Sequence, residues 1–247
     1  MTLLLDLGNT RLKWAVPAGD GWAGQGALAW PDDLSKALAV AWKDVATPSS
    51  IVAASVTSPA REAALAECAR ERFSRDIAWL RTPAAACGVI NAYREPERLG
   101  VDRFLAMVAA HADGLGACVL VGVGTALTLD ALAADGRHLG GLIAPGPQLM
   151  QQSLLGATAR VRPERDGVLV DAADNTADAV HSGCWQAAAA LVERFVARMT
   201  PRLGEGFTLS LSGGDALPLA ALLAIPARHT EDSVLRGLAV WAHAHCG

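Results

Sequence analysis

The chain has 247 residues, of which 52% are hydrophobic and 19% are charged, and its formal net charge is −4. This composition excludes an intrinsically disordered protein, and the acidic balance argues against a nucleic-acid partner, which usually meets a basic surface. The length suits one or two domains with a large hydrophobic core.

The five cysteines occur singly along the chain, with no C-x-x-C pair. An odd, unpatterned set favours reduced thiols in a cytoplasmic protein over a disulfide framework. The first residues lead directly into an apolar strand rather than a signal peptide, and no apolar run reaches the roughly 18 residues of a membrane-spanning helix. We therefore expect a soluble, cytoplasmic protein with no membrane partner.

Residues 3–16 predict a β-hairpin. An apolar strand leads to Asp6, the chain turns at residues 8–10, and apolar residues then recur at every second position from Leu12 to Val16. Two such stretches joined by a short polar turn are typical of antiparallel strands.

The polar residues of this hairpin suggest a phosphate site. Asp6 supplies a carboxylate, Gly8 an accessible backbone N–H, Asn9 and Thr10 polar side chains, and Lys13 an ammonium group. The N–H groups and the ammonium suit phosphate, and the carboxylate suits Mg²⁺. An ordinary hairpin, in which Gly8 and Asn9 only fill positions of positive φ, explains the same residues.

Strands and helices alternate through the rest of the first half. A helix starting at Gly100 is predicted by apolar residues at helical spacing and is expected to end at Gly114. The other predicted elements are a possible strand at 27–30, a helix after Asp33, a strand at 51–56, a capped helix ending near Phe73, and a strand at 77–80.

The second half repeats this order. Two strands flank a Gly-Thr turn at residues 122–125, as two strands flank the opening turn, which indicates duplicated architecture rather than duplicated sequence. The further predictions are strands at 117–121, 126–131, 138–143 and 208–211, and helices from Pro147 to about Leu155, from Asn175 to Met199, after Gly214 and from Glu231 to His245. The pattern predicts an α/β fold with domains at residues 1–115 and 116–247.

The second Gly-Thr turn is another candidate phosphate site. Gly124 would let the backbone approach an oxyanion closely, and Thr125 would donate a hydroxyl hydrogen bond. Asp130, predicted at a strand end, would bind a cation or simply cap a turn. The chain has no G-x-x-x-x-G-K-[ST] or G-x-G-x-x-G sequence, so an ATP site would have to use hairpin turns.

Asp102 and Arg103 fall in the first turn of the helix that follows Gly100. A carboxylate there is favoured by the helix dipole, so Asp102 is also simply a good helix-start residue. In a phosphotransferase, an aspartate of this kind accepts the proton of the substrate hydroxyl. Arg103 would bind a carboxylate or phosphate with two parallel hydrogen bonds.

Taken together and in order, these motifs resemble those of the type III pantothenate kinases over essentially the whole chain. The matching residues are Asp6-x-Gly8-Asn9-Thr10, Tyr93, Gly100-x-Asp102-Arg103, Gly124-Thr125-Ala126-x-Thr128-x-Asp130, Gly140-Gly141-x-Ile143-x-Pro145-Gly146, Thr176, Gly183 and Ser212-Gly213-Gly214.

The resemblance implies two ribonuclease-H-like domains of the acetate and sugar kinase, Hsp70 and actin fold, with the active site in the cleft. It implies ATP-dependent phosphorylation of the primary hydroxyl of pantothenate, the first step of coenzyme A synthesis. It also implies Mg²⁺ or another divalent cation, a monovalent cation (K⁺ or NH₄⁺) and a homodimer.

The resemblance also implies roles for individual residues. Asp102 would be the general base, Asp6 would hold the Mg²⁺–phosphate assembly, and Asp130 would bind the monovalent cation. The phosphates and ATP would lie near Gly8, Asn9, Thr10, Lys13, Gly124, Thr125, Gly213 and Gly214, and pantothenate near Tyr93, Gly100, Val101, Asp102, Arg103 and Thr176.

One position departs from the pattern of this fold. The second phosphate turn often begins with an acid two residues before the glycine, but here that residue is Gly122. Asp6 would then be the only carboxylate in either phosphate turn. Two alternatives remain: a non-catalytic homologue with a regulatory or accessory role, and a kinase of the same fold that acts on a different alcohol.

Overall fold

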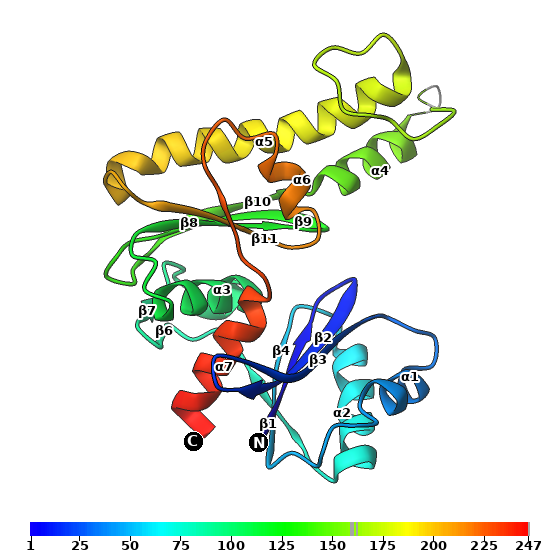
Figure 1. Ribbon diagram of the computed structural model, residues 1–247, viewed down its shortest axis with the longest axis vertical. Coiled ribbons are helices and arrows are strands. Elements are labelled where there is room, and N and C mark those ends of the chain that lie inside the picture. The colour runs from blue at the N-terminus through cyan, green and yellow to red at the C-terminus, as the bar shows by residue number, and fades with distance from the viewer. Residues whose placement is uncertain (159–160, 162, 247) are drawn as a thin grey trace. The chain divides into compact units, whose positions relative to one another are not determined.

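The computed structural model describes residues 1–158, 161 and 163–246 (Figure 1). It divides into two units, one formed by Met1–Gly114 with Asp232–Gly247 and the other by Leu115–Glu231. The first break lies one residue before the predicted one, at 114 instead of 115. The predicted second domain differs from the structure from Asp232 onward, because α7 (Ser233–Cys246) belongs to the first unit.

The first unit is built on a five-stranded sheet in the order β3-β2-β1-β4-β5. Strands β1 to β3 are antiparallel neighbours, whereas β4 runs parallel to β1 and β5 runs parallel to β4. The predicted hairpin is confirmed, and the third strand begins earlier than expected. The bounds are β1 (Thr2–Leu7), β2 (Arg11–Ala18), β3 (Gly21–Ala29), β4 (Ser50–Ser55) and β5 (Ile77–Leu80).

Helices pack on both faces of this sheet. Leu3 and Leu5 of β1 lie in a buried cluster with residues of α1 and α2, and Leu4 lies in a second cluster with residues of α3 and α7. An uninterrupted apolar run is typical of a strand covered on both faces. The elements are α1 (Leu34–Ala41), α2 (Pro59–Phe73), β6 (Ala85–Ala86), β7 (Val89–Ile90), η1 (Pro96–Arg98), α3 (Val101–Ala112) and α7 (Ser233–Cys246).

Polar caps begin two of these helices where the sequence predicted them. The Asp33 carboxylate accepts the backbone N–H of Lys36 at the start of α1, and the Ser58 hydroxyl accepts that of Arg61 at the start of α2. Each cap satisfies an N–H that the helix leaves without a partner, and such caps stabilise a helix by about 0.5–2 kcal/mol.

The second unit repeats the sheet of the first. Its strand order is β10-β9-β8-β11-β12, with β8 to β10 antiparallel and with β11 and β12 parallel to β8. The predicted duplication of architecture is therefore confirmed. The bounds are β8 (Cys118–Val123), β9 (Ala126–Leu132), β10 (His138–Pro145), β11 (Thr208–Ser212) and β12 (Arg228–His229).

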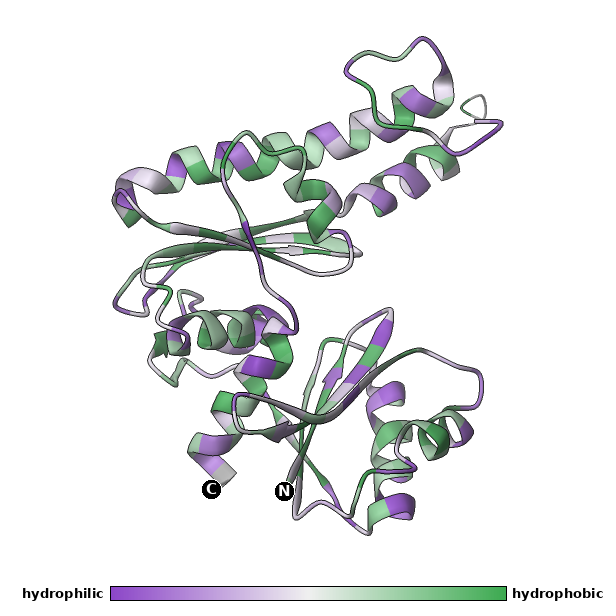
Figure 2. Ribbon diagram, viewed as in Figure 1, coloured by the Kyte–Doolittle hydropathy of each residue, from purple (hydrophilic) through white to green (hydrophobic). Residues whose placement is uncertain are grey.

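The long helix α5 covers one face of this second sheet. Val192 and Phe195 of α5 share a buried cluster with Val119, Leu129 and Leu209 of the strands. Figure 2 shows hydrophobic and hydrophilic residues interspersed along α5, as expected for a helix with one buried side. The helices are α4 (Pro147–Ala157), α5 (Thr176–Leu203) and α6 (Ala216–Ala220), and none of the described helices is long and apolar enough to span a membrane.

Candidate functional site

The turn between β1 and β2 is closed by a hydrogen bond of its own backbone. The Gly8 N–H donates to the Arg11 carbonyl at 3.0 Å, and a Cβ at position 8 would lie only 3.2 Å from that oxygen. The side chains of Asn9 and Thr10 are exposed. Neither Gly8 nor Asn9 has a positive φ, so the alternative in which they serve only left-handed turn positions is wrong.

Two side chains from other elements hold the carbonyl groups of this turn. Trp30 Nε1 donates to the Gly8 carbonyl at 2.9 Å, and Arg61 Nη1 donates to the Asn9 carbonyl at 2.8 Å. The Arg61 guanidinium also lies 4.5 Å from the centre of the Trp30 ring, within range of a cation–π interaction. Neither contact was predicted from the sequence, because Trp30 and Arg61 carry no motif of their own.

Asp6 lies opposite Lys13 in the register of the hairpin, at the end of β1. Burial raises the pKa of Asp6 from 3.8 to about 7; Lys13 lowers it, and repulsion by Asp102 and Asp232 raises it further. Asp6 therefore lies close to two other carboxylates and one ammonium. A partly dehydrated site with excess negative charge favours a bound cation.

Asp102 lies in the first turn of α3, where Gly100 is the N-cap residue. Its Oδ1 accepts the backbone N–H of Arg103 at 2.8 Å, and a Cβ at position 100 would lie 2.5 Å from this oxygen. Glycine at 100 thus leaves room for the carboxylate to fold back over the helix start. Asp102 also lies near enough to Asp6 for its charge to raise the pKa of Asp6.

Arg103 and Tyr93 form a polar contact next to this helix start. The Arg103 side chain is buried, and its Nη1 donates to the Tyr93 hydroxyl at 3.1 Å. The Tyr93 N–H donates to Asn91 Oδ1 at 2.9 Å, which holds the tyrosine segment in place. Two residues predicted to bind the same ligand are thus brought together. The Val101 side chain, by contrast, packs in the core.

In the second unit, three glycine-containing turns meet. Gly146 N–H donates to the Thr125 carbonyl at 2.9 Å, and a Cβ at 146 would overlap the Gly124 carbonyl. Gly213 has a φ of 105°, and a Cβ there would overlap the Val123 carbonyl. Glycine is required at both positions because the backbones approach too closely for a side chain.

The same turns are joined by a side-chain hydrogen bond. Gln148 Nε2 of α4 donates to Asp215 Oδ1, next to Gly213 and Gly214, at 2.9 Å. Burial raises the pKa of Asp215, and this hydrogen bond lowers it. The predicted residues Gly124, Thr125, Gly213 and Gly214 thus belong to one cluster, to which Gly146, Gln148 and Asp215 also belong. Gly146 was named beforehand only as part of the family motif, and Gln148 and Asp215 were not predicted.

Asp130 lies near the end of β9, which continues two residues further to Leu132. The alternative that it caps a turn is wrong, because the residue is within the strand and only 3% exposed. His138 Nε2 lies 2.9 Å from Asp130 Oδ1, across the β9–β10 hairpin. This pair was not predicted from the sequence, because it depends on the register of β9 against β10.

Thr128, the register partner of Gly122 on β9, restricts the space for a side chain at position 122. A Cβ at position 122 would lie 2.6 Å from Thr128 Oγ1, so an acid there would require the threonine to shift.

Thr176 is exposed at the first position of α5, where Asn175 caps the helix by accepting the Asp178 N–H. Asp178 also accepts two hydrogen bonds from Arg165, both at 2.8 Å, and this pairing holds the pKa of Asp178 well below its usual range. The segment before α5 is thereby fastened to the helix that carries Thr176.

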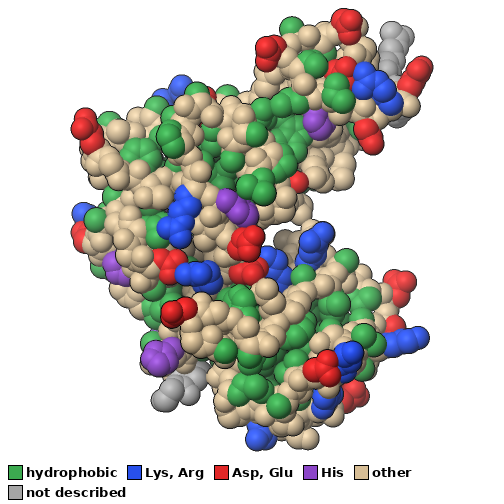
Figure 3. All heavy atoms as spheres, in the orientation of Figure 1, with side chains coloured by type: hydrophobic (Ala, Val, Ile, Leu, Met, Phe, Trp, Pro, Cys, Tyr) green, Lys and Arg blue, Asp and Glu red, His purple; other side chains and the backbone are tan. Residues whose placement is uncertain are grey.

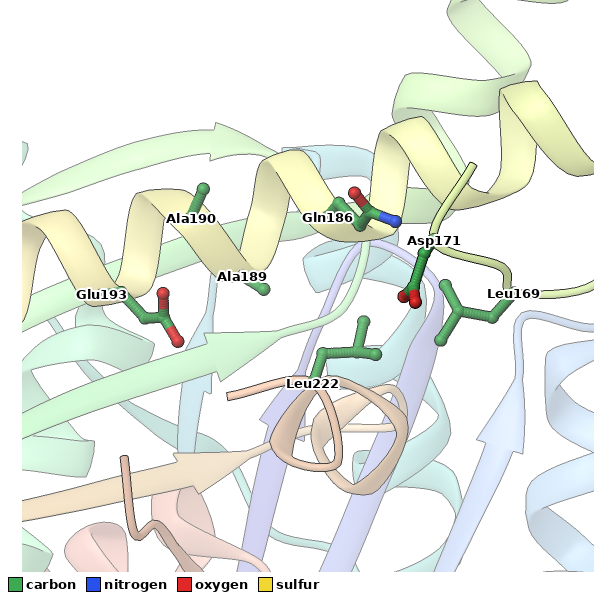
Figure 4. Close-up of a pocket in the computed structure, with 7 residues that line it drawn as sticks. All are labelled: Leu169, Asp171, Gln186, Ala189, Ala190, Glu193 and Leu222. Carbon is green, nitrogen blue, oxygen red and sulfur yellow. The ribbon is translucent and has the colours of Figure 1, made fainter. Parts of the chain in front are cut away.

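A cavity of about 350 Å³ lies along α5 (Figure 4). Gln186 and Glu193 project from the helix, while Asp171 comes from the segment before it. The cavity contains none of the predicted site residues. Its lining consists of Leu169, Asp171, Gln186, Ala189, Ala190, Glu193 and Leu222.

Charges of both signs share the surface, and basic and acidic side chains are interspersed on the face shown in Figure 3. Within the described part of the chain, no group of three or more His, Cys, Asp and Glu side chains is arranged to hold a metal ion. A divalent cation at Asp6 would therefore depend on ligands from bound phosphates and water, which is usual for Mg²⁺.

Comparison with known sequences gives one family. A family model described as "Type III pantothenate kinase" matches residues 2–198. A protein of that name from Laribacter hongkongensis is 45% identical over 247 residues, covering 100% of both chains. Another of the same name, from Aromatoleum aromaticum, is 41% identical over 244 residues, covering 98% of each.

Comparison with solved structures identifies the fold. A putative Baf family transcriptional activator from Campylobacter jejuni has a TM-score of 0.63 at 20% identity, covering 99% of this chain and 98% of its own. A putative 2-dehydro-3-deoxygalactonokinase from Sinorhizobium meliloti has a TM-score of 0.62 at 18% identity, covering 99% of each chain. At these identities the likeness concerns the fold alone, and it confirms the two ribonuclease-H-like units.

Proposed function

The chain belongs to the type III pantothenate kinase family, and we propose on this basis that it transfers the γ-phosphoryl group of ATP to the primary hydroxyl of pantothenate. This would be the first step of coenzyme A synthesis. The observation that carries the proposal is the grouping of Asp6, Lys13 and Asp102 in the first unit, where the family motifs fall.

Asp102 is the proposed general base. As the pantothenate oxygen attacks the γ-phosphorus, an O–P bond forms, the bond from phosphorus to the β–γ bridging oxygen breaks, and the hydroxyl proton passes to the Asp102 carboxylate. The hydrogen bond from the Arg103 N–H to Asp102 Oδ1 supports this role, because it fixes the orientation of the carboxylate.

Asp6 is the proposed divalent-metal residue. Mg²⁺ bound beside the ATP phosphates would neutralise charge during transfer. The raised pKa of Asp6 supports the assignment, because the carboxylate gains more from a nearby cation where water solvates it poorly. Asn9, Thr10 and Lys13 would bind the phosphates through backbone N–H groups, polar side chains and the ammonium. The Gly8 N–H already donates to the Arg11 carbonyl, so Gly8 would contribute by letting a phosphate approach the backbone closely.

The other substrate contacts follow the family pattern. The Arg103 guanidinium and the Tyr93 hydroxyl would bind the polar groups of pantothenate, together with the backbone at Gly100 and Val101 and the side chain of Thr176. On the second unit, Gly124 and Thr125 would form the other phosphate turn, with Gly213 and Gly214 near the adenosine. A Cβ at Gly124 or Gly214 would meet nothing within 4 Å, and this open space beside the two turns supports a place for a nucleotide.

Asp130 is the proposed ligand of a monovalent cation, K⁺ or NH₄⁺. The ion would share the Asp130 carboxylate with the His138 imidazole, whose Nε2 lies 2.9 Å from Asp130 Oδ1. Comparing turnover in K⁺, NH₄⁺ and Na⁺ tests this assignment. Equal turnover in all three salts would remove it.

We further propose a cytoplasmic homodimer. Cys68, Cys87, Cys118 and Cys184 form no disulfide, which suits a reducing compartment. Size-exclusion chromatography with light scattering should give twice the chain mass of 25.6 kDa. A mass of one chain would contradict the dimer.

The deciding experiment is a coupled ADP-release assay with ATP, Mg²⁺ and pantothenate in K⁺ or Na⁺. Pantothenate-dependent turnover is expected. Its absence in every salt would refute the proposal, and turnover only with another alcohol would make the protein a different small-molecule kinase. No specific observation favours a non-catalytic regulatory homologue.

A further inference from the structure

Asp232 lies at the point where the chain returns to the first unit, immediately before α7. Its φ of 48° is unusual for a residue other than glycine, and its carbonyl accepts the Arg236 N–H at 2.9 Å, which begins the helix. No sequence motif singles out this residue.

The Asp232 side chain reaches the opening hairpin. Its Oδ1 lies 3.1 Å from Lys13 Nζ, between residues 219 positions apart, and the two side chains are 25% and 37% exposed respectively. Lys13 is also the register partner of Asp6. One ammonium is therefore close to two carboxylates carried by different elements, and only one of these, Asp6, belongs to a phosphate turn.

The position of Lys13 decides what Asp6 can bind. A lysine side chain is long and flexible, and without an anchor its ammonium would be drawn to the carboxylate directly across the hairpin. An ammonium resting on Asp6 would compete with Mg²⁺ for the same oxygens and would be less available to phosphate. The ion pair with Asp232 gives the ammonium a second carboxylate partner, which competes with Asp6 for it.

From this geometry we infer that Asp232 is a positioning residue: it holds Lys13 beside the phosphate turn so that Asp6 stays available to a divalent cation. The inference rests on the proposed assignment of Asp6 as the metal residue. Asp232 itself would touch neither the metal nor the substrate, and its effect would act through Lys13.

The chain offers a matched control at the same helix. Arg236 Nη2 in the first turn of α7 pairs with both carboxylate oxygens of Asp113, at 2.8 and 3.0 Å, and the Asp113 side chain is also 25% exposed. Asp113→Asn therefore removes one ion pair of α7, as Asp232→Asn removes the ion pair with Lys13. The two aspartates are equally exposed, and the two substitutions change the net charge equally. If Asp232 only fastens α7, the two substitutions should behave alike.

The test measures Mn²⁺ affinity by electron paramagnetic resonance, in the presence of a non-hydrolysable ATP analogue, alongside the Mg²⁺ dependence of kcat. Asp232→Asn should weaken Mn²⁺ binding by about 10- to 100-fold, the usual effect of losing a residue that orients a metal site. Asp113→Asn should stay within about twofold of the wild type, because it is not part of such a site. Asp232→Gly, which suits the positive φ, should keep the fold and weaken Mn²⁺ binding like Asp232→Asn.

The decisive comparison uses a second background. In Lys13→Met protein, Asp232→Asn should have no further effect on Mn²⁺ affinity, because the group it positions is gone. An unchanged affinity in Asp232→Asn, a loss equal to that of Asp113→Asn, or a full loss persisting in Lys13→Met would each overturn the inference. The binding readout needs no pantothenate turnover, so failure of the proposed function would be seen separately in the activity assay.

Discussion

The two units use one sheet topology for different purposes, and the turns at β1–β2 and β8–β9 show this most clearly. Each turn joins the first two strands of its sheet, and Gly8 corresponds to Gly124. Two residues earlier, the first unit has Asp6 opposite Lys13, whereas the second has Gly122 opposite Thr128. The first turn thus has a pair of oppositely charged residues beside it, whereas the second turn has a glycine and a threonine at the corresponding positions.

The surroundings of the two turns differ in the same way. Side chains hold the first turn, through Trp30 on the Gly8 carbonyl and Arg61 on the Asn9 carbonyl. Backbone holds the second, through Gly146 and Gly213 packed against its carbonyls. A duplicated fold can therefore gather charged side chains around one turn while the corresponding turn of the other copy is packed closely by backbone.

The largest expected effect comes from removing Asp102, the proposed proton acceptor in the first unit. Asp102→Asn should lower kcat by about 10²- to 10⁴-fold, the usual contribution of a general base, with little change in the KM for ATP. Steady-state kinetics in the ADP-release assay measure both. A variant with near-normal kcat would remove the base assignment while leaving the reaction itself unchallenged.

The buried charge of the first turn should appear in the pH dependence of stability. Because the folded pKa of Asp6 is raised to about 7, the folded protein keeps a proton between pH 4 and 7 that the unfolded chain releases. The free energy of unfolding should therefore fall as the pH rises. In metal-free buffer, Asp6→Asn should remove about 2–3 kcal/mol of this fall between pH 5 and 8.

Urea unfolding at both pH values measures that difference. Asp113→Asn is the control: its acid pairs with Arg236, so it should leave the fall in stability in place. Identical pH dependence in the wild type and Asp6→Asn would show that the Asp6 carboxylate is not desolvated.

The close backbone packing of the second unit should be disrupted by a side chain at position 146. Gly146→Ala places a methyl group on the Gly124 carbonyl and should lower the free energy of unfolding by about 2–3 kcal/mol. The same change at Gly156, an exposed position in α4 where a Cβ meets nothing within 4 Å, should raise it by about 0.5–1 kcal/mol. Equal effects in thermal or urea unfolding would contradict the close approach.

The smallest expected effect concerns Gly122, which occupies the position in the second unit that Asp6 occupies in the first. Gly122→Ala should cost about 1 kcal/mol, because its Cβ would lie 2.6 Å from Thr128 Oγ1. In a Thr128→Ala background the cost should disappear, and a double-mutant cycle in urea unfolding measures this coupling. Additive losses would mean that Thr128 is not what excludes a side chain at position 122.

By itself, the sequence was sufficient to predict most of the longer strands, most helix limits and the duplicated α/β plan, but not the start of β3 or the two-residue strands β6, β7 and β12. Periodicity and caps such as Asp33, Ser58 and Asn175 act over a few residues, so they can be read locally. The same holds for the placement of Asp6 beside a turn and of Asp102 in a first helical turn, since both follow from neighbouring residues.

Only the tertiary structure decided which distant groups meet. Helix α7 joins the first unit and brings Asp232 to Lys13, Asp130 pairs with His138 inside the sheet, and Gly146 and Gly213 converge on one turn. These contacts depend on how whole strands and helices pack. Leu235 and Leu238 of α7 are buried in the first unit, but the hydrophobic effect that buries them has no direction and does not by itself select one sheet over another. Local sequence propensity does not determine which sheet a helix packs against or which strands pair, and so the partners of Lys13 and Asp130 could not be predicted.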